Sequence, residues 1–188
     1  MTVLLVVLGA AAAWGVWIYN RLVALRNQVQ NAWKQIDVQL KRRHDLIPNL
    51  VAAVKGAMDF ERSTLEAVIA ARNKAVSATG VKDTARAEGE LTQALGRLFA
   101  LTEAYPELKS NQNVLQLQEE LTSTENKVGF ARQLYNDVAT QYNTKQATFP
   151  TLLVAGLAKA TPAELWEIED VAERAVPKVD LSLNKPPQ

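Results

Sequence analysis

Apolar side chains recur at alternating steps of three and four residues along most of the chain, which is the period of one face of a helix. The pattern is most regular between Val114 and Tyr142, where it runs without a fault. Such a heptad seam predicts a long helix with coiled-coil-like packing, and Thr124 on the seam would help to set its register. Phe149–Pro150 ends this helix. The seam residues are Val114, Leu117, Leu121, Thr124, Val128, Ala131, Tyr135, Val138 and Tyr142.

Two stretches before this seam carry the same period. The first runs from Leu22 to Gly80, and Pro48 within it predicts a kink, because proline lacks the backbone donor that a helix needs. The second spans residues 84–104 and is stopped by Tyr105–Pro106. Together with the seam, these stretches predict a soluble part made of long helices.

The segment after Pro150 has a different character. It opens with an apolar patch over residues 152–158. Thr161–Pro162–Ala163–Glu164 follows and combines a capping box with proline in the first helical position, which predicts a helix start. The predicted helix is acidic and ends at Pro177, and the tail beyond it is expected to be loose.

The first residues of the chain form an apolar run without a charged side chain, from Val3 to Tyr19. As a helix, its 17 residues rise about 25 Å, which is at the short end of what crosses a bilayer. Trp14, Trp17 and Tyr19 crowd its C-terminal end, where amphipathic rings suit the boundary between membrane and water. These three residues are therefore the candidate membrane-interface residues.

A cleaved signal peptide is the alternative interpretation of this run, and Ala10 to Ala13 offers small residues for cleavage. However, no Lys or Arg precedes the run, so the basic region that begins most signal peptides is missing. A retained single-pass anchor is favoured. Because no helix breaker lies between Tyr19 and Pro48, the anchor is expected to continue directly into the first soluble helix.

The charges around the anchor predict its orientation. Arg21, Arg26 and Lys34 follow the run, whereas only the α-amino group precedes it. Since positively charged flanks stay on the cytoplasmic side, the soluble part is expected in the cytoplasm and the N-terminus outside. Gly9 and Ala13 lie four residues apart, would let anchor helices approach closely, and are candidate self-association residues.

Composition restricts the remaining functions. Lys and Arg total 21 against 20 for Asp and Glu, so the net charge gives no reason to expect nucleic acid as a partner. The chain has no cysteine, which excludes disulfides, iron–sulfur clusters and thiolate catalysis. Phosphate-binding loops, nucleophile elbows and metal-ligand spacings are absent from the sequence, so no cofactor and no enzyme activity are expected.

His44 is the one histidine, and beside Asp45 it would allow acid–base chemistry. It follows the basic turn Lys41–Arg42–Arg43, so an ordinary surface side chain is favoured over a catalytic one. For the turn itself, a solvated face or pairing with the acidic last helix is favoured over contact with lipid headgroups. A stiff helix would hold the turn about 33 Å beyond the span.

Several strings between residues 19 and 150 are more specific than helix periodicity. They include Tyr19–Asn20–Arg21–Leu22–Val23, Asp45–Leu46–Ile47–Pro48–Asn49–Leu50–Val51, Tyr135–Asn136, Tyr142–Asn143 and Phe149–Pro150. By these strings the chain resembles the LemA family. The resemblance implies an N-terminal helix in the bacterial inner (cytoplasmic) membrane and a four-helix-type soluble bundle with one very long helix.

The predicted fold class is all-α, with an N-terminal transmembrane helix that continues into an antiparallel long-helix bundle of a four-helix, coiled-coil-like type. Residues 1–20 form the anchor and residues 21–150 the bundle. Residues 151–188 hold the apolar patch, the acidic helix and the tail.

The leading functional hypothesis is a membrane-anchored scaffold that self-associates into a homo-oligomer through helix faces, with the lipid bilayer as its other partner. Leu152, Leu153 and Leu157 of the apolar patch, and Trp166 of the following helix, are further candidate self-association residues. The heptad seam is compatible with contacts within one chain or between chains. The alternative is a membrane-tethered adaptor that presents the bundle to a cytoplasmic or membrane protein.

Overall fold

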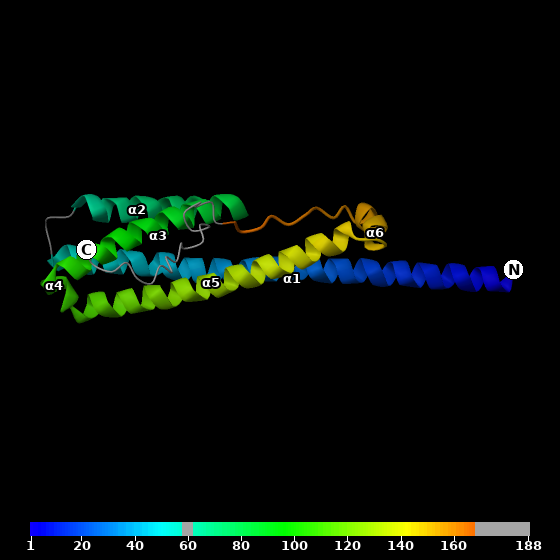
Figure 1. Cartoon of the computed structure of the whole chain (residues 1–188), viewed down its shortest axis with the longest axis horizontal. Coiled ribbons are helices and arrows are strands. Elements are labelled where there is room, and N and C mark those ends of the chain that lie inside the picture. Colours follow the sequence, from blue (N-terminus) through cyan, green and yellow to red (C-terminus); the bar gives the residue numbers. More distant parts are fainter. Residues whose placement is uncertain (58–61, 168–188) are drawn as a thin grey trace, which may run out of the picture.

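The computed structural model describes residues 1–57 and 62–167. Within these residues the chain forms six helices and no strand, which confirms the all-α prediction. The four long helices run alternately up and down the long axis of the molecule, and α1 extends far beyond the others at its N-terminal end (Figure 1). The helices are α1 (Thr2–Ala57), α2 (Arg62–Ser77), α3 (Val81–Ala104), α4 (Pro106–Lys109), α5 (Gln112–Ala147) and α6 (Thr151–Leu157).

α1 is a single helix of 56 residues that carries the apolar N-terminal run directly into the bundle, as predicted. It also continues through Pro48. A proline at this position has no N–H for the carbonyl of His44, four residues earlier. The Nε of Arg72 on α2 donates to that carbonyl oxygen over 2.9 Å. A second helix therefore satisfies the acceptor that Pro48 leaves free.

The stretch that the sequence predicts as one helix up to Gly80 is two helices. α1 ends at Ala57, and α2 runs back beside it (Figure 1). Leu50 on α1 and Leu65 on α2 are buried in one cluster, so the two helices pack against each other across the reversal. Helix periodicity does not reveal the reversal, because the spacing of apolar residues is the same whether a helix continues or turns back.

α3 and α5 agree with the sequence. Gly80, with a φ of 82°, precedes α3, and α3 ends before Tyr105–Pro106. α5 is 36 residues long. The α5 seam is buried along α1 of the same chain, and Leu121, Thr124 and Tyr135 are 2%, 1% and 3% exposed. The seam is therefore an intramolecular contact.

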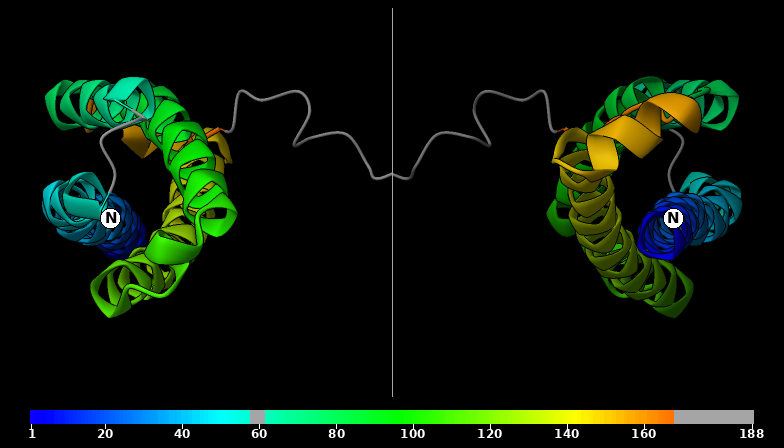
Figure 2. Two further views of the ribbon diagram at one scale, coloured as in Figure 1. Left: turned by 90° about the vertical axis from the view of Figure 1, so that its left-hand side faces the viewer. Right: turned by 90° about the vertical axis from the view of Figure 1, so that its right-hand side faces the viewer.

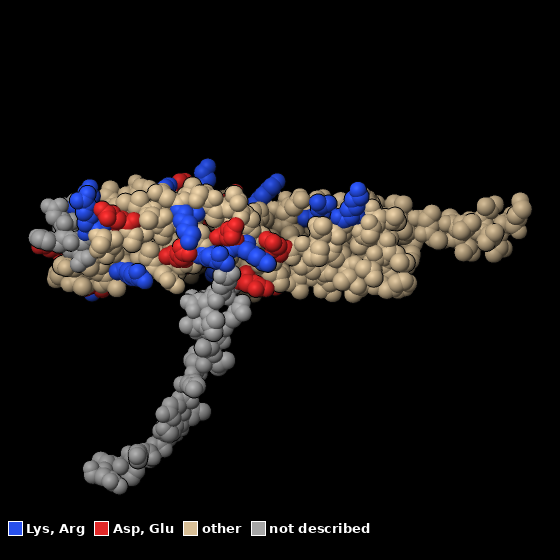
Figure 3. Space-filling model, turned by 90° about the horizontal axis from the view of Figure 1, so that it is seen from above, with Lys and Arg blue, Asp and Glu red and all other residues tan. Residues whose placement is uncertain are grey.

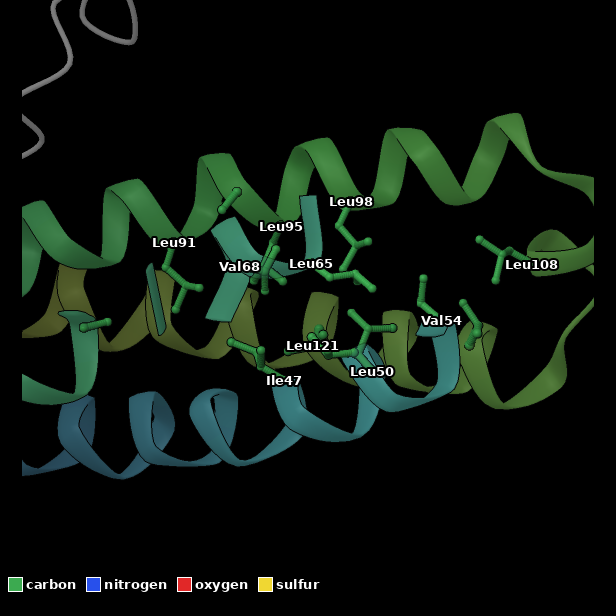
Figure 4. Close-up of a cluster of buried hydrophobic side chains, with 14 of the residues drawn as sticks. Ile47, Leu50, Val54, Leu65, Val68, Leu91, Leu95, Leu98, Leu108 and Leu121 are labelled. Atoms are coloured by element: carbon green, nitrogen blue, oxygen red, sulfur yellow. The ribbon is translucent and has the colours of Figure 1, made fainter. Parts of the chain in front are cut away.

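Buried apolar side chains form two clusters along the molecule. In the distal cluster α1, α2, α3 and α5 all contribute side chains (Figure 4). The proximal cluster lies nearer the N-terminus, where α6 and residues 160–166 cover α1 and α5. End-on views show α2, α3 and α6 on the same side of the α1–α5 pair (Figure 2). The long pair is thus covered along one side by different elements at its two ends.

Residues 160–167 contain no helix, so the predicted helix start at Thr161 is wrong. These residues, here called the strap, run back from α6 along the bundle (Figure 1). The capping signal predicts a helix here, whose backbone groups would bond to one another. Instead, the strap backbone forms hydrogen bonds with side chains of α5. The rest of the predicted acidic helix and the tail lie outside the described residues.

Candidate functional site

The protruding part of α1 exposes large apolar side chains. Its most apolar 18-residue window has a mean hydropathy of 2.0, and 6% of that window is buried. A core helix of a soluble protein would be mostly buried, so the exposure distinguishes this segment from one. Within the described part of the chain, α1 is the one helix long and apolar enough to cross a membrane. On the face shown in Figure 3, charged side chains lie over the bundle and the protruding end shows none.

The three aromatic residues predicted at the membrane interface lie where the bundle begins. Trp14, Trp17 and Tyr19 are 53%, 59% and 46% exposed. Ile18 is 5% exposed, so the other face of the same turn of α1 is covered by the bundle. The guanidinium of Arg21 lies 6.0 Å from the centre of the Trp17 ring. One helix therefore presents an apolar run, then aromatic rings, then a cation.

α6 packs beside this aromatic end of the run. Its own Thr151 and Ala155 are buried, and its other face exposes apolar side chains. The exposed set, here called the α6 patch, is Phe149 (79%), Leu152 (54%), Leu153 (66%) and Leu157 (86%). Pro150 and Thr151 line a pocket with Trp14, Trp17, Ile18, Arg21 and Leu22 of α1 and Lys145 of α5. Leu152, Leu153 and Leu157, which the sequence analysis names as candidate contact residues, are thus on the surface. They lie on the helix that packs beside the apolar run.

The candidate self-association residues do not form one surface. Gly9 and Ala13 lie on the exposed part of α1, and a side chain added at Gly9 would meet nothing within 4 Å. Trp166, by contrast, is 4% exposed and buried within its own chain. It is therefore not available to a second copy. The sequence analysis grouped Trp166 with the candidate self-association residues, and its burial removes it from that group.

Two asparagines of α5 hold the strap by its backbone. Asn136 accepts a hydrogen bond from the Trp166 amide over 2.8 Å and donates one to the Trp166 carbonyl over 2.9 Å. Asn143 makes the same pair of bonds with Ala163, both over 2.8 Å. Each side-chain amide thus pairs with both backbone polar groups of one residue, as the opposite residue in an antiparallel ladder would. The N–H and C=O groups of Ala163 and Trp166 therefore have partners on α5 although the strap is not helical.

The spacing of the two asparagines matches that of an extended chain. Seven residues of helix rise about 10.5 Å, and three extended residues span about 10 Å. Asn136 and Asn143 are therefore about as far apart along α5 as Trp166 and Ala163 are along the strap, which runs antiparallel to α5. The repeated Tyr–Asn pairs of the sequence are the local sign of this contact, although their partners lie 20 and 30 residues away.

Trp166 fixes the end of the strap in an aromatic cluster. Its ring centre lies 5.9 Å from that of Trp33, which meets Tyr135 edge-on at 5.5 Å. The guanidinium of Arg132 lies 5.7 Å from the Trp166 ring. The Tyr135 hydroxyl donates to the Glu164 carbonyl over 2.7 Å. Burial, followed by the negative charge of Glu164, raises the pKa of Tyr135, so the hydroxyl keeps the proton that it donates.

The distal half of the bundle buries a cluster of charged side chains. Arg43 and Glu88 are 3% and 4% exposed, and their side chains meet over 3.0 Å. Glu88 also lies 2.6 Å from Nε2 of His44, and Arg43 reaches Glu125 over 2.9 Å. This ionic cluster joins α1, α3 and α5. A solvated face, or pairing with the acidic last helix, is wrong for Arg43, and an ordinary surface side chain is wrong for His44. Both side chains turn inward to Glu88.

Sequence reasoning does not single out Glu88, although the pattern of α3 contains it. Thr84, Glu88, Leu91 and Leu95 follow one another at steps of four, three and four residues, and all four are buried. An acidic residue on a buried stripe requires a partner. Nothing within one helix identifies that partner, which lies on α1.

The pair of His44 and Glu88 has a distance suited to proton exchange. However, the two side chains are 10% and 4% exposed, so little of either is open to a substrate. Across residues 1–57 and 62–167, no group of three or more His, Asp or Glu is placed to hold a metal ion. The arrangement is suited to joining helices.

A surface groove of about 480 Å³ lies between α1 and α5, and neither the strap nor α2, α3 or α6 lines it. Three of its apolar residues, Val38, Phe130 and Leu134, are 64%, 73% and 46% exposed. The lining of this α1–α5 groove consists of Lys34, Gln35, Val38, Gln39, Lys127, Phe130, Ala131 and Leu134. The groove leaves part of the long pair uncovered.

The sequence is similar to a known protein family and to several named proteins. A model of the LemA family matches residues 32–181, which begins after the apolar run and extends beyond Pro150. "Protein LemA" of Metamycoplasma hominis is 31% identical over 138 residues, which cover 72% of this chain and 63% of that protein. "Magnetosome protein MamQ 1" and "Magnetosome protein MamQ 2" of Paramagnetospirillum magneticum are each 24% identical over 175 residues, covering 79% of this chain and 64% of each relative. The chain thus spans just under two thirds of the length of these relatives.

Glu88→Ala should lower the free energy of unfolding by about 3–5 kcal/mol, because it leaves the buried Arg43 without its main partner. Chemical denaturation of the full chain in detergent measures this loss. Glu90→Ala is the matched control, since Glu90 pairs with Lys74 on the exposed surface. The control should cost no more than about 1 kcal/mol. Equal losses for the two variants would contradict a buried ionic cluster.

Asn136→Ala combined with Asn143→Ala should release the strap from α5. We expect hydrogen exchange at the Ala163 and Trp166 amides to become at least about tenfold faster, because both amides lose their acceptors. Asn126→Ala is the control, since Asn126 is exposed on the same helix. Unchanged protection of the two amides in the double variant would show that the asparagines do not hold the strap.

Proposed function

The chain belongs to the LemA family, and on this premise we propose that it is a membrane-anchored, non-catalytic helical scaffold that self-associates. The observation that carries the proposal is the exposed apolar end of α1, which continues without a break into the bundle. An apolar helix is a stable form for a chain within a bilayer, because its backbone groups bond to one another.

The proposed orientation has the bundle on the cytoplasmic side of a bacterial inner membrane. Arg21 and Arg26 follow the apolar run, and no basic side chain precedes it in this sequence. Positively charged flanks are retained in the cytoplasm. A membrane-impermeant maleimide should therefore label a Val76→Cys variant, whose residue 76 is exposed on α2, only after cell lysis. Labelling in intact spheroplasts would show that the bundle lies on the outer side of the membrane.

A non-catalytic role is supported by what the polar side chains inside the bundle do. Arg43 and His44 both bond to Glu88 in the interior. Asn136 and Asn143 bond to the strap. The names of the family and of its relatives describe no reaction. These polar groups hold elements of the bundle together, which is a structural role.

Self-association is supported by surfaces that the chain itself leaves free. The α5 seam is used within the chain, so contacts between copies need another face. The α1–α5 groove offers one, because Val38, Phe130 and Leu134 form an exposed apolar strip along it. Gly9 and Ala13 leave room for a second anchor helix to approach. A scaffold would use both surfaces, one in the membrane and one beside it.

A membrane-tethered adaptor is the second candidate, and the same α1–α5 groove favours it. In that function a partner of different sequence would fill the groove. The mass of the detergent-extracted particle separates the two functions. A scaffold leaves the membrane as a large, homogeneous particle, whereas an adaptor leaves it as a small one.

Leu5→Arg combined with Leu8→Arg should release the chain from the membrane, because each arginine in a span costs about 2.5–3.5 kcal/mol. We expect this variant in the supernatant after carbonate washing, whereas the wild type stays in the pellet. Val38→Arg changes an exposed residue in the bundle part of α1 and is the control that should stay in the pellet. A double variant that remains in the pellet counts against the anchor.

Phe130→Asp combined with Leu134→Asp should reduce the mass of the extracted particle, because carboxylates would have to be buried between copies at the groove. Mass photometry measures the change, and the thermal midpoint should stay near that of the wild type since both side chains are exposed. Leu115→Asp is the control, at a residue of α5 that is 44% exposed and outside the groove. An unchanged mass excludes the groove as the contact, and a monomeric wild type favours the adaptor.

A further inference from the structure

The α6 patch is an apolar surface that residues 1–57 and 62–167 leave exposed. Phe149, Leu152, Leu153 and Leu157 are between 54% and 86% exposed, although Thr151 and Ala155 of the same helix are 3% and 6% exposed. α6 is therefore fixed to the bundle by one face and presents the other outward. A contiguous exposed patch of this kind indicates a contact with lipid or with another molecule.

The position of α6 along α1 identifies which contact this is. The start of α6 shares a pocket with Trp14, Trp17 and Ile18, which lie within the apolar run itself. The bundle therefore begins beside the run, before the run ends at Tyr19.

The overlap between this pocket and the apolar run sets the level of α6. Trp14, Trp17 and Ile18 belong to the run that is proposed to span the bilayer, and they lie at its bundle-side end. A run that lies in the bilayer therefore brings this end of the run, and α6 beside it, into the bundle-side leaflet.

We propose that α6 and Phe149 insert into the bundle-side leaflet as a second, interfacial membrane element beside the anchor. The occupant of the α6 patch is lipid, whose acyl chains contact Leu152, Leu153 and Leu157. This proposal rests on the proposed anchoring by α1, and it reassigns the three leucines from self-association to lipid contact.

Basic side chains lie near both ends of α6. Arg21 and Lys145 line the pocket between α1 and the start of α6. Lys159, two residues after α6, is exposed. An apolar surface bordered by cations suits a leaflet whose acyl chains lie beneath phosphate groups. The anchor and α6 together would fix both the depth and the rotation of the bundle, which a single span leaves free.

The test uses the full chain, which has no native cysteine and can be labelled at one chosen residue. Leu153→Cys and Leu157→Cys variants, each carrying the environment-sensitive dye NBD, are reconstituted into phosphatidylcholine vesicles. Vesicles with spin-labelled acyl chains are compared with unlabelled ones. We expect the spin label to lower NBD emission roughly twofold or more at both residues, as for a side chain within the leaflet.

Two further variants make the result decisive. Val6→Cys lies in the anchor and should be quenched by the spin label, whereas Leu115→Cys, on α5 far from α6, should not. Quenching at Val6 without quenching at Leu153 and Leu157 overturns the insertion of α6 and leaves the anchor intact. Absence of quenching at Val6 overturns the proposed anchoring itself. Blue-shifted NBD emission at Leu153 that the lipid spin label does not quench means that a second copy covers the patch, which also overturns the proposal.

Discussion

The packing of α5 along α1 is the contact on which the rest of the structure depends. A lone helix in water gains little from its own hydrogen bonds, and burying one face supplies most of its stability. The seam of α5 provides that burial for α1 from the distal cluster to Leu22 in the proximal cluster. The remaining elements then cover one side of a pair that is already formed (Figure 2). α2 and α3 pack mainly on each other, and α2 connects this hairpin to α1. The strap packs on the pair itself.

Buried polar contacts fix each element at one place along this pair. Arg72 of α2 bonds to the carbonyl that Pro48 frees, so α2 meets α1 at a turn where an acceptor is open. Glu88 of α3 meets Arg43 in the same region. The two asparagines of α5 set the register of the strap. Apolar packing tolerates small shifts, whereas an unpaired buried polar group is costly, so these contacts select one arrangement.

The continuity of α1 connects the apolar run to the bundle. The helix passes from the exposed apolar run through the proximal cluster and on to Ala57 without a break. With the run placed in a bilayer, as proposed, this one helix would set the levels of the bundle, the α6 patch and the α1–α5 groove. Fixed levels of this kind suit the proposed scaffold or adaptor.

The sequence by itself determined what depends on neighbouring residues: the apolar run from Val3, the unbroken seam of α5, the helix end at Phe149–Pro150 and the family resemblance. Periodicity and stop signals are local, so one segment contains them. Only the tertiary structure decided the reversal after Ala57, the inward turn of Arg43 to Glu88, and the extended strap. In the strap, the local helix signal at Thr161 gave way to hydrogen bonds from Asn136 and Asn143. Those partners lie 20 to 30 residues away, and only the packing of α5 on α1 brings them within reach.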